Sequence, residues 1–144
     1  MIRVEMNQSR LRGGQRLPKS VLDKTLRHVS KALGGVNGVV SVAFISSTEM
    51  RKLNRTCRRK DKITDVLSFE LDEGTLKGEV LISYEQAKRQ AKEARHSTRD
   101  EIVFLLVHGI LHVFGYDHIK PSDKKKMFRL QERILDSLGI DASL

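Results

Sequence analysis

Residues 108–118 read HGILHVFGYDH and contain three of the five histidines of the 144-residue chain. His108 and His112 are four residues apart, so on a helix they lie on the same face, one turn above the other. Gly115 favours the left-handed conformation that ends a helix, and the resulting turn would bring His118 towards the other two. Three imidazoles that converge on one point, with a fourth position left open, are typical of a catalytic zinc site. The alternative is that these histidines are simply buried or solvated.

The residue after His108 separates this pattern from that of a metalloprotease. The spacing matches the metzincin pattern H-E-x-x-H-x-x-G-x-x-H, except that Gly109 stands in place of the glutamate. A glycine cannot accept a proton from a zinc-bound water. The residues therefore predict a metzincin-like zinc-binding helix with one zinc ion per chain, held by His108, His112 and His118, but without the base of a peptidase.

The charge balance indicates a polyanionic partner. Lysine and arginine total 27 against 18 acidic residues, a net charge of +9, and such a chain attracts nucleic acid. Basic residues that only solvate helices are the alternative. The basic side chains concentrate in residues 51–62 and on one face of a helix expected near residues 83–95. The candidate RNA contacts are Arg55, Arg59, Lys60, Lys88, Arg89 and Lys92.

Composition and length predict one domain in a reducing compartment. A chain of 144 residues is long enough for one core, so residues 1–144 are expected to form a single metal-dependent hydrolase-like domain. The one cysteine excludes an internal disulfide framework. Neither a signal-peptide core nor a membrane-length apolar run is visible. We therefore expect a cytoplasmic protein with no membrane partner.

Hydrophobic periodicity predicts an α+β fold, a small mixed β-sheet packed with about five helices. The helix that carries His108 and His112 is apolar nearly all round, so it should run through the core. The segment 71–77 is expected to be an acidic turn between two strands that pair as a hairpin. The expected strands are 2–6, 39–45, 64–69 and 78–82, and the expected helices are 18–33, 46–53, 83–95, one from residue 98 and one from residue 121.

Three blocks of the chain match a known set of signatures. Residues 108–118 resemble H-G-x-L-H-L-x-G-Y-D-H, residues 53–69 resemble L-N-x-x-[YF]-R-x-x-D-x-P-T-[DN]-V-L-S-F, and residues 78–83 resemble G-D-I-x-I-S, each with substitutions. The chain thus resembles, over nearly its whole length, the YbeY family of bacterial endoribonucleases. The resemblance implies zinc held by three histidines and a catalytic arginine at Arg58. It also implies single-stranded RNA as substrate, a role in ribosomal RNA maturation and ribosome quality control, ribosomal particles as partners, and no action on DNA.

Arg58 and two carboxylates complete the predicted site. An arginine fork binds phosphate oxygens bidentately, which would stabilise the scissile phosphate. Judged from the residues alone, Arg58 fits a solvated member of the basic run better than a catalytic residue. Asp117 precedes a predicted ligand, and we expect it to orient a histidine rather than to act as the base. Asp65 is the other candidate proton acceptor.

Three functions are compatible with these residues. The leading hypothesis is a zinc-dependent endoribonuclease, that is, a hydrolase of RNA phosphodiester bonds. The alternative is a zinc-stabilised RNA-binding factor for ribosome assembly with little catalysis of its own, which the glycine at position 109 keeps open. A peptidase with an unusual base is the third, and the same glycine argues against it.

Overall fold

The computed structural model describes residues 1–58, 66–116 and 120–141, apart from the side chains of Cys57, Arg58 and Asp72. Its elements follow the predicted order β-α-β-α-β-β-α-α-α, with one short 3-10 helix in the segment expected to be a loop. They are β1 (Ile2–Asn7), η1 (Gly13–Gln15), α1 (Lys19–Ala32), β2 (Gly38–Ile45), α2 (Ser47–Arg58), β3 (Val66–Glu73), β4 (Leu76–Ser83), α3 (Tyr84–Ala94), α4 (Thr98–Val113) and α5 (Pro121–Ser137).

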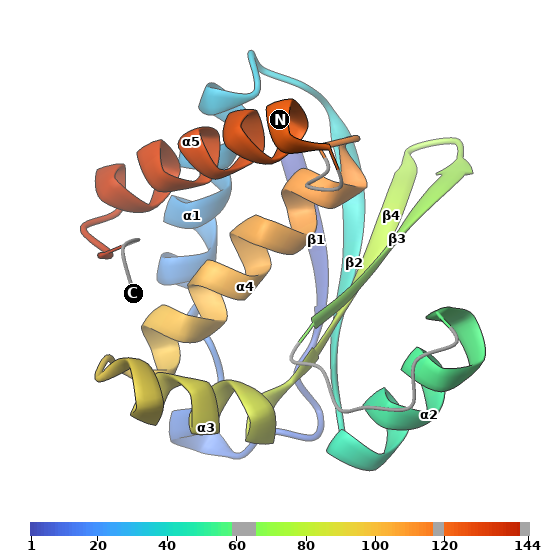
Figure 1. The fold of residues 1–144 in the computed structure, drawn as a ribbon, viewed down its shortest axis with the longest axis vertical. Coiled ribbons are helices and arrows are strands. Elements are labelled where there is room, and N and C mark those ends of the chain that lie inside the picture. The colour runs from blue at the N-terminus through green and yellow to red at the C-terminus, as the bar shows by residue number, and fades with distance from the viewer. Residues whose placement is uncertain (59–65, 117–119, 142–144) are drawn as a thin grey trace.

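The four strands form one mixed sheet in the order β1-β2-β4-β3. β2 pairs in parallel with β1 and with β4, whereas β3 and β4 form the predicted antiparallel hairpin. With five α-helices around it, the sheet confirms the α+β fold of a single domain with a small mixed sheet (Figure 1). Within the described ranges, no helix is both long and apolar enough to cross a membrane.

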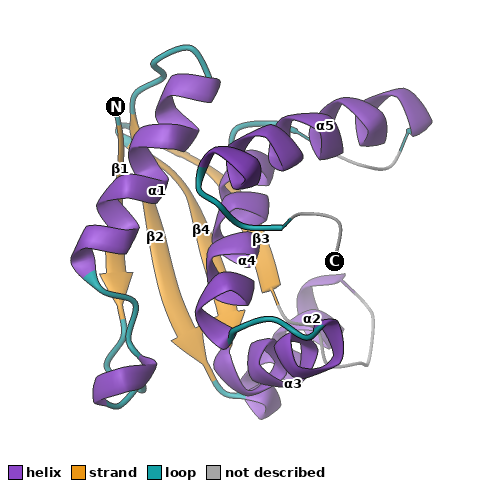
Figure 2. Cartoon of the chain, turned by 90° about the vertical axis from the view of Figure 1, so that its left-hand side faces the viewer, coloured by secondary structure: helices purple, strands orange, loops and turns teal. Residues whose placement is uncertain are grey.

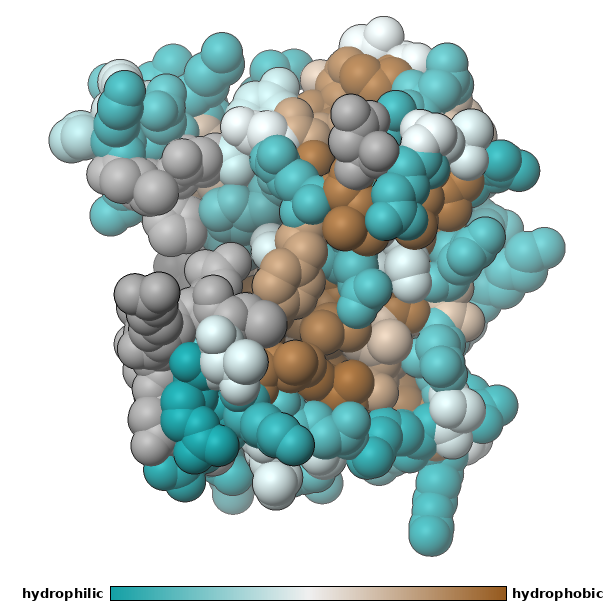
Figure 3. Space-filling view, turned by 90° about the vertical axis from the view of Figure 1, so that its right-hand side faces the viewer, coloured by the Kyte–Doolittle hydropathy of each residue, from teal (hydrophilic) through white to brown (hydrophobic). Residues whose placement is uncertain are grey.

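The helices cover the two faces of the sheet unequally. The main core lies between the sheet and α1, α3, α4 and α5, and α4 runs through its middle with ten buried residues (Figure 2). The predicted core helix is therefore confirmed. Among the described helices, α2 alone packs on the other face, through Met50 against Leu67 and Leu81. Viewed from this side, hydrophobic side chains gather along the middle of the molecule and hydrophilic ones surround them (Figure 3).

Side chains and glycines fix the helix ends largely as the sequence predicts. At the start of α2, the backbone N–H of Glu49 donates to Ser46 Oγ at 3.1 Å, and the Ser46 N–H donates to the Glu49 carboxylate at 3.3 Å. Ser83 Oγ accepts from the N–H of Gln86 at the start of α3. Gly115 takes a φ of 94° after α4, and the N–H of Tyr116 donates back to the carbonyl of Leu111 at 3.0 Å. This left-handed ending turns the chain away from the helix axis.

Two element boundaries differ from the prediction. The segment 71–77 is not an extended turn, because β3 continues to Glu73 and β4 begins at Leu76, which leaves Gly74, with a φ of 67°, and its neighbour to reverse the chain. α2 runs on to Arg58 rather than ending at residue 53, and the extension shows no apolar pattern because Asn54 is its buried residue while Arg55 and Thr56 are exposed. α4 begins at Thr98 as predicted, and Ser97 caps it, since the Ser97 Oγ accepts from the N–H of Asp100.

α4 lies directly on β4 because two glycines remove side chains from the contact. A Cβ atom at Gly109 of α4 would lie 2.7 Å from Cγ1 of Val80, and one at Gly78 of β4 would lie 2.6 Å from Cγ1 of Val113. Carbon atoms in ordinary contact are about 3.5–4.0 Å apart. Glycine is therefore required at the two places where this helix and this strand come closest.

We expect Gly109→Ala to lower the free energy of unfolding by about 1–2 kcal/mol. The added methyl group overpacks the contact with Val80, which is fully buried, and overpacking typically costs about 1–3 kcal/mol. Alanine in place of glycine in a helix interior offsets at most about 1 kcal/mol of this. Urea unfolding followed by circular dichroism measures the difference.

Gly14→Ala is the matched control, because no atom lies within 4 Å of a Cβ built at that position. Its stability should change by less than about 0.5 kcal/mol. The double variant Gly109→Ala/Val80→Ala should be destabilised by less than the sum of its two single changes, since the smaller partner makes room for the methyl group. A Gly109→Ala protein as stable as the parent would contradict the close contact.

Candidate metal centre

His108 and His112 point their ring nitrogens at each other on one flank of α4. Their Nε2 atoms are 3.1 Å apart, and the two rings are nearly perpendicular, at 78° with centroids 4.7 Å apart. Two imidazole nitrogens bound to one tetrahedral zinc at 2.0–2.1 Å would be about 3.3 Å apart. The pair therefore fits a shared metal ion with a small adjustment, and both rings are only partly buried.

Gln131 of α5 holds the ring of His108 from the other side. His108 Nδ1 lies 2.7 Å from Gln131 Oε1, and the glutamine is 6% exposed. An amide oxygen only accepts, so Nδ1 carries the proton and the Nε2 lone pair is left for a metal ion. Ligand histidines in metal sites commonly have such an acceptor behind them. This interaction makes Gln131 a candidate positioning residue for the site.

The predicted site falls only partly within the described chain. His118 and Asp117 lie outside it, as do Asp65, Arg59 and Lys60, and Arg58 ends α2 with its side chain undescribed. Among the residues that are described, no three histidine, cysteine or acidic side chains come close enough together to hold a metal ion. The three-histidine site therefore stays a prediction, and the structure supplies its first two members, together with the Gly115 turn that follows them.

The N-terminus of α2 is fixed firmly, which positions the helix that carries Arg55 and Arg58. Hydrogen bonds from the backbone and then the side chain of Ser46 hold the pKa of Glu49 below its usual value, with a smaller contribution from the charge of Arg10. The Arg10 guanidinium lies 2.5 Å from the same carboxylate. Arg55 is exposed on this helix, so it is free to meet a ligand from solvent.

The predicted basic face of α3 lies on its solvent side. Ala87 and Ala91 are buried beneath the helix, whereas Lys88, Arg89 and Lys92 are exposed. α3 meets α2 through Ser47, whose Oγ lies 3.2 Å from the Glu85 carboxylate. The two helices with predicted RNA contacts therefore adjoin at one end of the molecule, opposite α5 (Figure 1).

Comparisons with known proteins agree over nearly the whole chain. Residues 3–139 match the family model described as endoribonuclease YbeY. An Aquifex aeolicus protein named endoribonuclease YbeY is 43% identical over 130 residues, which cover 87% of each chain. A Finegoldia magna protein of the same name is 41% identical over 127 residues, 84% of this chain and 83% of the relative. The solution structure of TM1509 from Thermotoga maritima is similar with a TM-score of 0.60 and 28% identity, covering 96% of this chain and 91% of that one.

We expect Gln131→Leu to weaken zinc binding about 10- to 100-fold, the usual effect of removing the acceptor behind a ligand histidine. Leucine keeps most of the side-chain volume but cannot accept from His108 Nδ1, so the ring loses its fixed tautomer. Isothermal titration of metal-free protein with zinc measures the change.

Gln131→Glu keeps an acceptor in the same place, so zinc affinity should be retained. Glu132→Gln, at the exposed neighbouring position, controls for changes to α5 that do not reach the histidines. If Gln131→Leu folds and binds zinc like the parent protein, Gln131 does not position His108 for a metal.

Proposed function

Because the chain belongs to the endoribonuclease YbeY family, we propose that it cleaves RNA internally with a zinc ion held by His108, His112 and His118. The observation that carries the proposal is the convergence of two Nε2 atoms, 3.1 Å apart, with the opposite nitrogen of His108 held by Gln131. Neutral imidazoles are the ligands that zinc takes in catalytic sites with an open position. The left-handed turn at Gly115 directs the chain back after His112, which supports His118 as the third ligand.

The chemistry of the proposed site follows from its charges. Three neutral ligands leave a bound zinc ion its full positive charge, which polarises a phosphodiester and lowers the pKa of a bound water to about 7. Arg58 is proposed to bind the remaining phosphate oxygens with its planar fork. Asp117 is proposed to accept a hydrogen bond from a ligand histidine, and Asp65 is the second candidate for taking up a proton.

Gly109 excludes a protein base at the position where metalloproteases have one. It faces β4, where a Cβ atom would already be 2.7 Å from Val80 Cγ1. A glutamate at position 109 would therefore meet the sheet before it could reach the histidines. This contact argues against the peptidase hypothesis. Because it leaves α4 without a base, it also favours the second candidate function, a zinc-stabilised RNA-binding assembly factor with little catalysis.

The proposed substrate is single-stranded RNA of ribosomal precursors, within ribosomal particles of the cytoplasm. The net charge of +9 and the exposed cations of α2 and α3 support a polyanionic ligand. Arg55, Arg59, Lys60, Lys88, Arg89 and Lys92 are proposed to contact phosphates. RNA rather than DNA is proposed because the family is one of endoribonucleases.

Metal-loaded protein should cleave single-stranded RNA and should leave duplex RNA and a peptide pool largely intact. His112→Ala removes one of the two converging nitrogens, so cleavage should fall to background and bound zinc should be lost. Product gels and elemental analysis measure the two effects. Equal cleavage by the parent and His112→Ala proteins would identify a contaminating ribonuclease, whereas RNA binding without cleavage would favour the assembly factor.

Arg58→Lys should lose cleavage activity while it retains fold and zinc. Lysine keeps the charge but not the bidentate fork that matches a phosphate. Single-turnover cleavage and zinc content give the two readouts. Arg59→Lys is the control, because it makes the same change at the neighbouring position. Equal losses in both variants would indicate general RNA binding and not a role at the scissile phosphate.

A further inference from the structure

The outer side of α5 carries a row of cations. Met127, Ile134 and Leu135 bury one side of the helix against the core. On the outward side, two adjacent lysines are followed by arginines three or four residues further on each time, which places all four within one stripe along the helix. The row consists of Lys125, Lys126, Arg129 and Arg133, all of them exposed.

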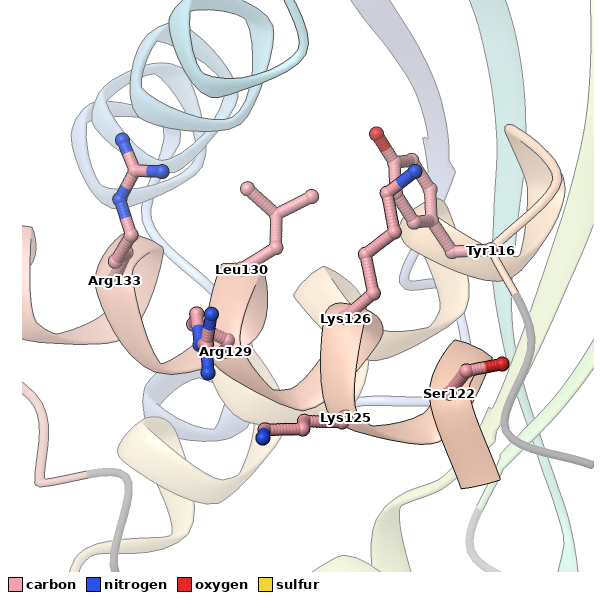
Figure 4. A pocket seen from close by; sticks show the side chains of 7 residues that line it. All are labelled: Tyr116, Ser122, Lys125, Lys126, Arg129, Leu130 and Arg133. Carbon is pink, nitrogen blue, oxygen red and sulfur yellow. The ribbon is translucent and has the colours of Figure 1, made fainter. Parts of the chain in front are cut away.

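This row lines a hollow rather than a convex surface. A cavity of about 400 Å³ lies against α5 and is lined by the four cations together with Tyr116 and Leu130. Figure 4 shows Lys126 and Tyr116 at one end, Lys125 and Arg129 projecting from the outer side of the helix, and Arg133 a turn further along. The tyrosine adds an aromatic face at the end nearest to α4, where a base could stack.

The hollow continues between α5 and α1. A second cavity of about 570 Å³ shares Arg133 with the first and is lined on the α1 side by Arg27, His28 and Lys31. Its floor is tied together by a hydrogen bond between the two helices. Ser137 Oγ donates its proton to the carbonyl of Ile134 at 2.6 Å, so it accepts from His28 Nδ1 at 2.7 Å. We call the two cavities together the α1–α5 groove.

The cations of the α1–α5 groove are available to a ligand. None of Arg27, Lys31, Lys126, Arg129 and Arg133 forms an ion pair with a residue in the described ranges 1–58, 66–116 and 120–141. Among the described residues, no acidic side chain lines either cavity. Acidic residues do line two adjoining hollows: Asp123 lies in one with Lys126, and Glu132 lies in another with Lys125 and Arg129. Within the two cavities of the groove, every charged side chain among the described residues is therefore basic.

The groove is separate from the histidine pair. Gln131, which holds His108, is two residues from Arg129 and two from Arg133. Two residues correspond to a rotation of about 200° on an α-helix, so these arginines lie on the opposite side of α5 from the glutamine. A ligand in the groove therefore does not touch the atoms that would react at His108 and His112.

We propose that the α1–α5 groove binds the sugar-phosphate backbone of RNA away from the point of cleavage. This rests on the proposed function, which makes RNA the available polyanion. Arginine forks and lysine ammonium groups in a row along a helix suit successive phosphates, and they carry no base specificity. The groove therefore adds affinity for long RNA and has no part in the cleavage step.

The test compares long and short RNA in two charge-matched variants. Lys126→Gln/Arg129→Gln/Arg133→Gln removes three groove cations. Arg12→Gln/Lys19→Gln/Arg99→Gln removes three exposed cations that line neither cavity. Binding of a structured ribosomal RNA fragment is measured by filter retention at several salt concentrations. Cleavage of a hexanucleotide, which is too short to span both surfaces, reports on the histidine site.

The groove variant should bind the long RNA at least about tenfold more weakly. The slope of its log binding constant against log salt concentration should be smaller in magnitude by about two to three. The control variant should bind like the parent, and the loss should be confined to the long RNA. If both variants lost the same RNA affinity, the proposal that RNA binds in the groove would be wrong. Slower hexanucleotide cleavage in the groove variant would also contradict it. RNA binding is measured independently of cleavage. A parent protein that cleaves neither RNA would therefore refute the proposed function, while the binding data would still test the groove. Unchanged melting temperatures establish that both variants fold.

Discussion

The contact between α4 and β4 determines how the central helix and its two histidines are placed on the sheet. At Gly109 and Gly78 the missing side chains let helix and strand approach to distances that no Cβ atom could share with Val80 or Val113. The contact also fixes the rotation of α4 about its own axis. With Gly109 facing the sheet, His108 and His112 are turned from that direction by about 100° and 60° to the same flank. Both imidazoles therefore emerge beside α5, where Gln131 meets the first of them.

The same rotation explains why a glycine follows the first histidine. A larger residue at position 109 would push α4 off the sheet, so the position cannot also supply a base. Any proton acceptor for the reaction has to come from outside α4 or from solvent activated at a metal. The packing of the core at position 109 therefore also limits which catalytic groups α4 can supply.

Much of the fold could be predicted from the sequence, because its signals are local. Capping residues such as Ser46 and Ser83 and the turn glycine Gly115 specify helix ends through contacts within a few residues. The full strand order could not be predicted, since β4 pairs on one side with β2, which is distant in sequence, as well as with its hairpin partner β3. The extent of β3 and β4 was missed because the hairpin end is rich in polar residues, such as the exposed Glu70 and Glu73, and so resembles a turn in composition.

The candidate site could likewise be predicted in part. The spacing of His108 and His112 predicts their shared face without knowledge of the fold. Gln131 was missed because its role depends on how α5 crosses α4, although one signal was present. It is a polar residue four positions after Met127 and three before Ile134, on a helix face that is otherwise apolar. A glutamine at a core position has to satisfy its hydrogen bonds somewhere, and here the partner is His108.

α5 thus carries two separate kinds of side chain on opposite sides. Its inner side orients His108, and its outer side presents the cations of the α1–α5 groove. The helix is held by its own buried face, and the bond between His28 and Ser137 ties its far end to α1. Because one rigid helix links the two sides, RNA seated in the groove would be held at a fixed distance from the histidines. Such an arrangement favours long or structured substrates through binding alone, without changing the groups that act at the scissile phosphate.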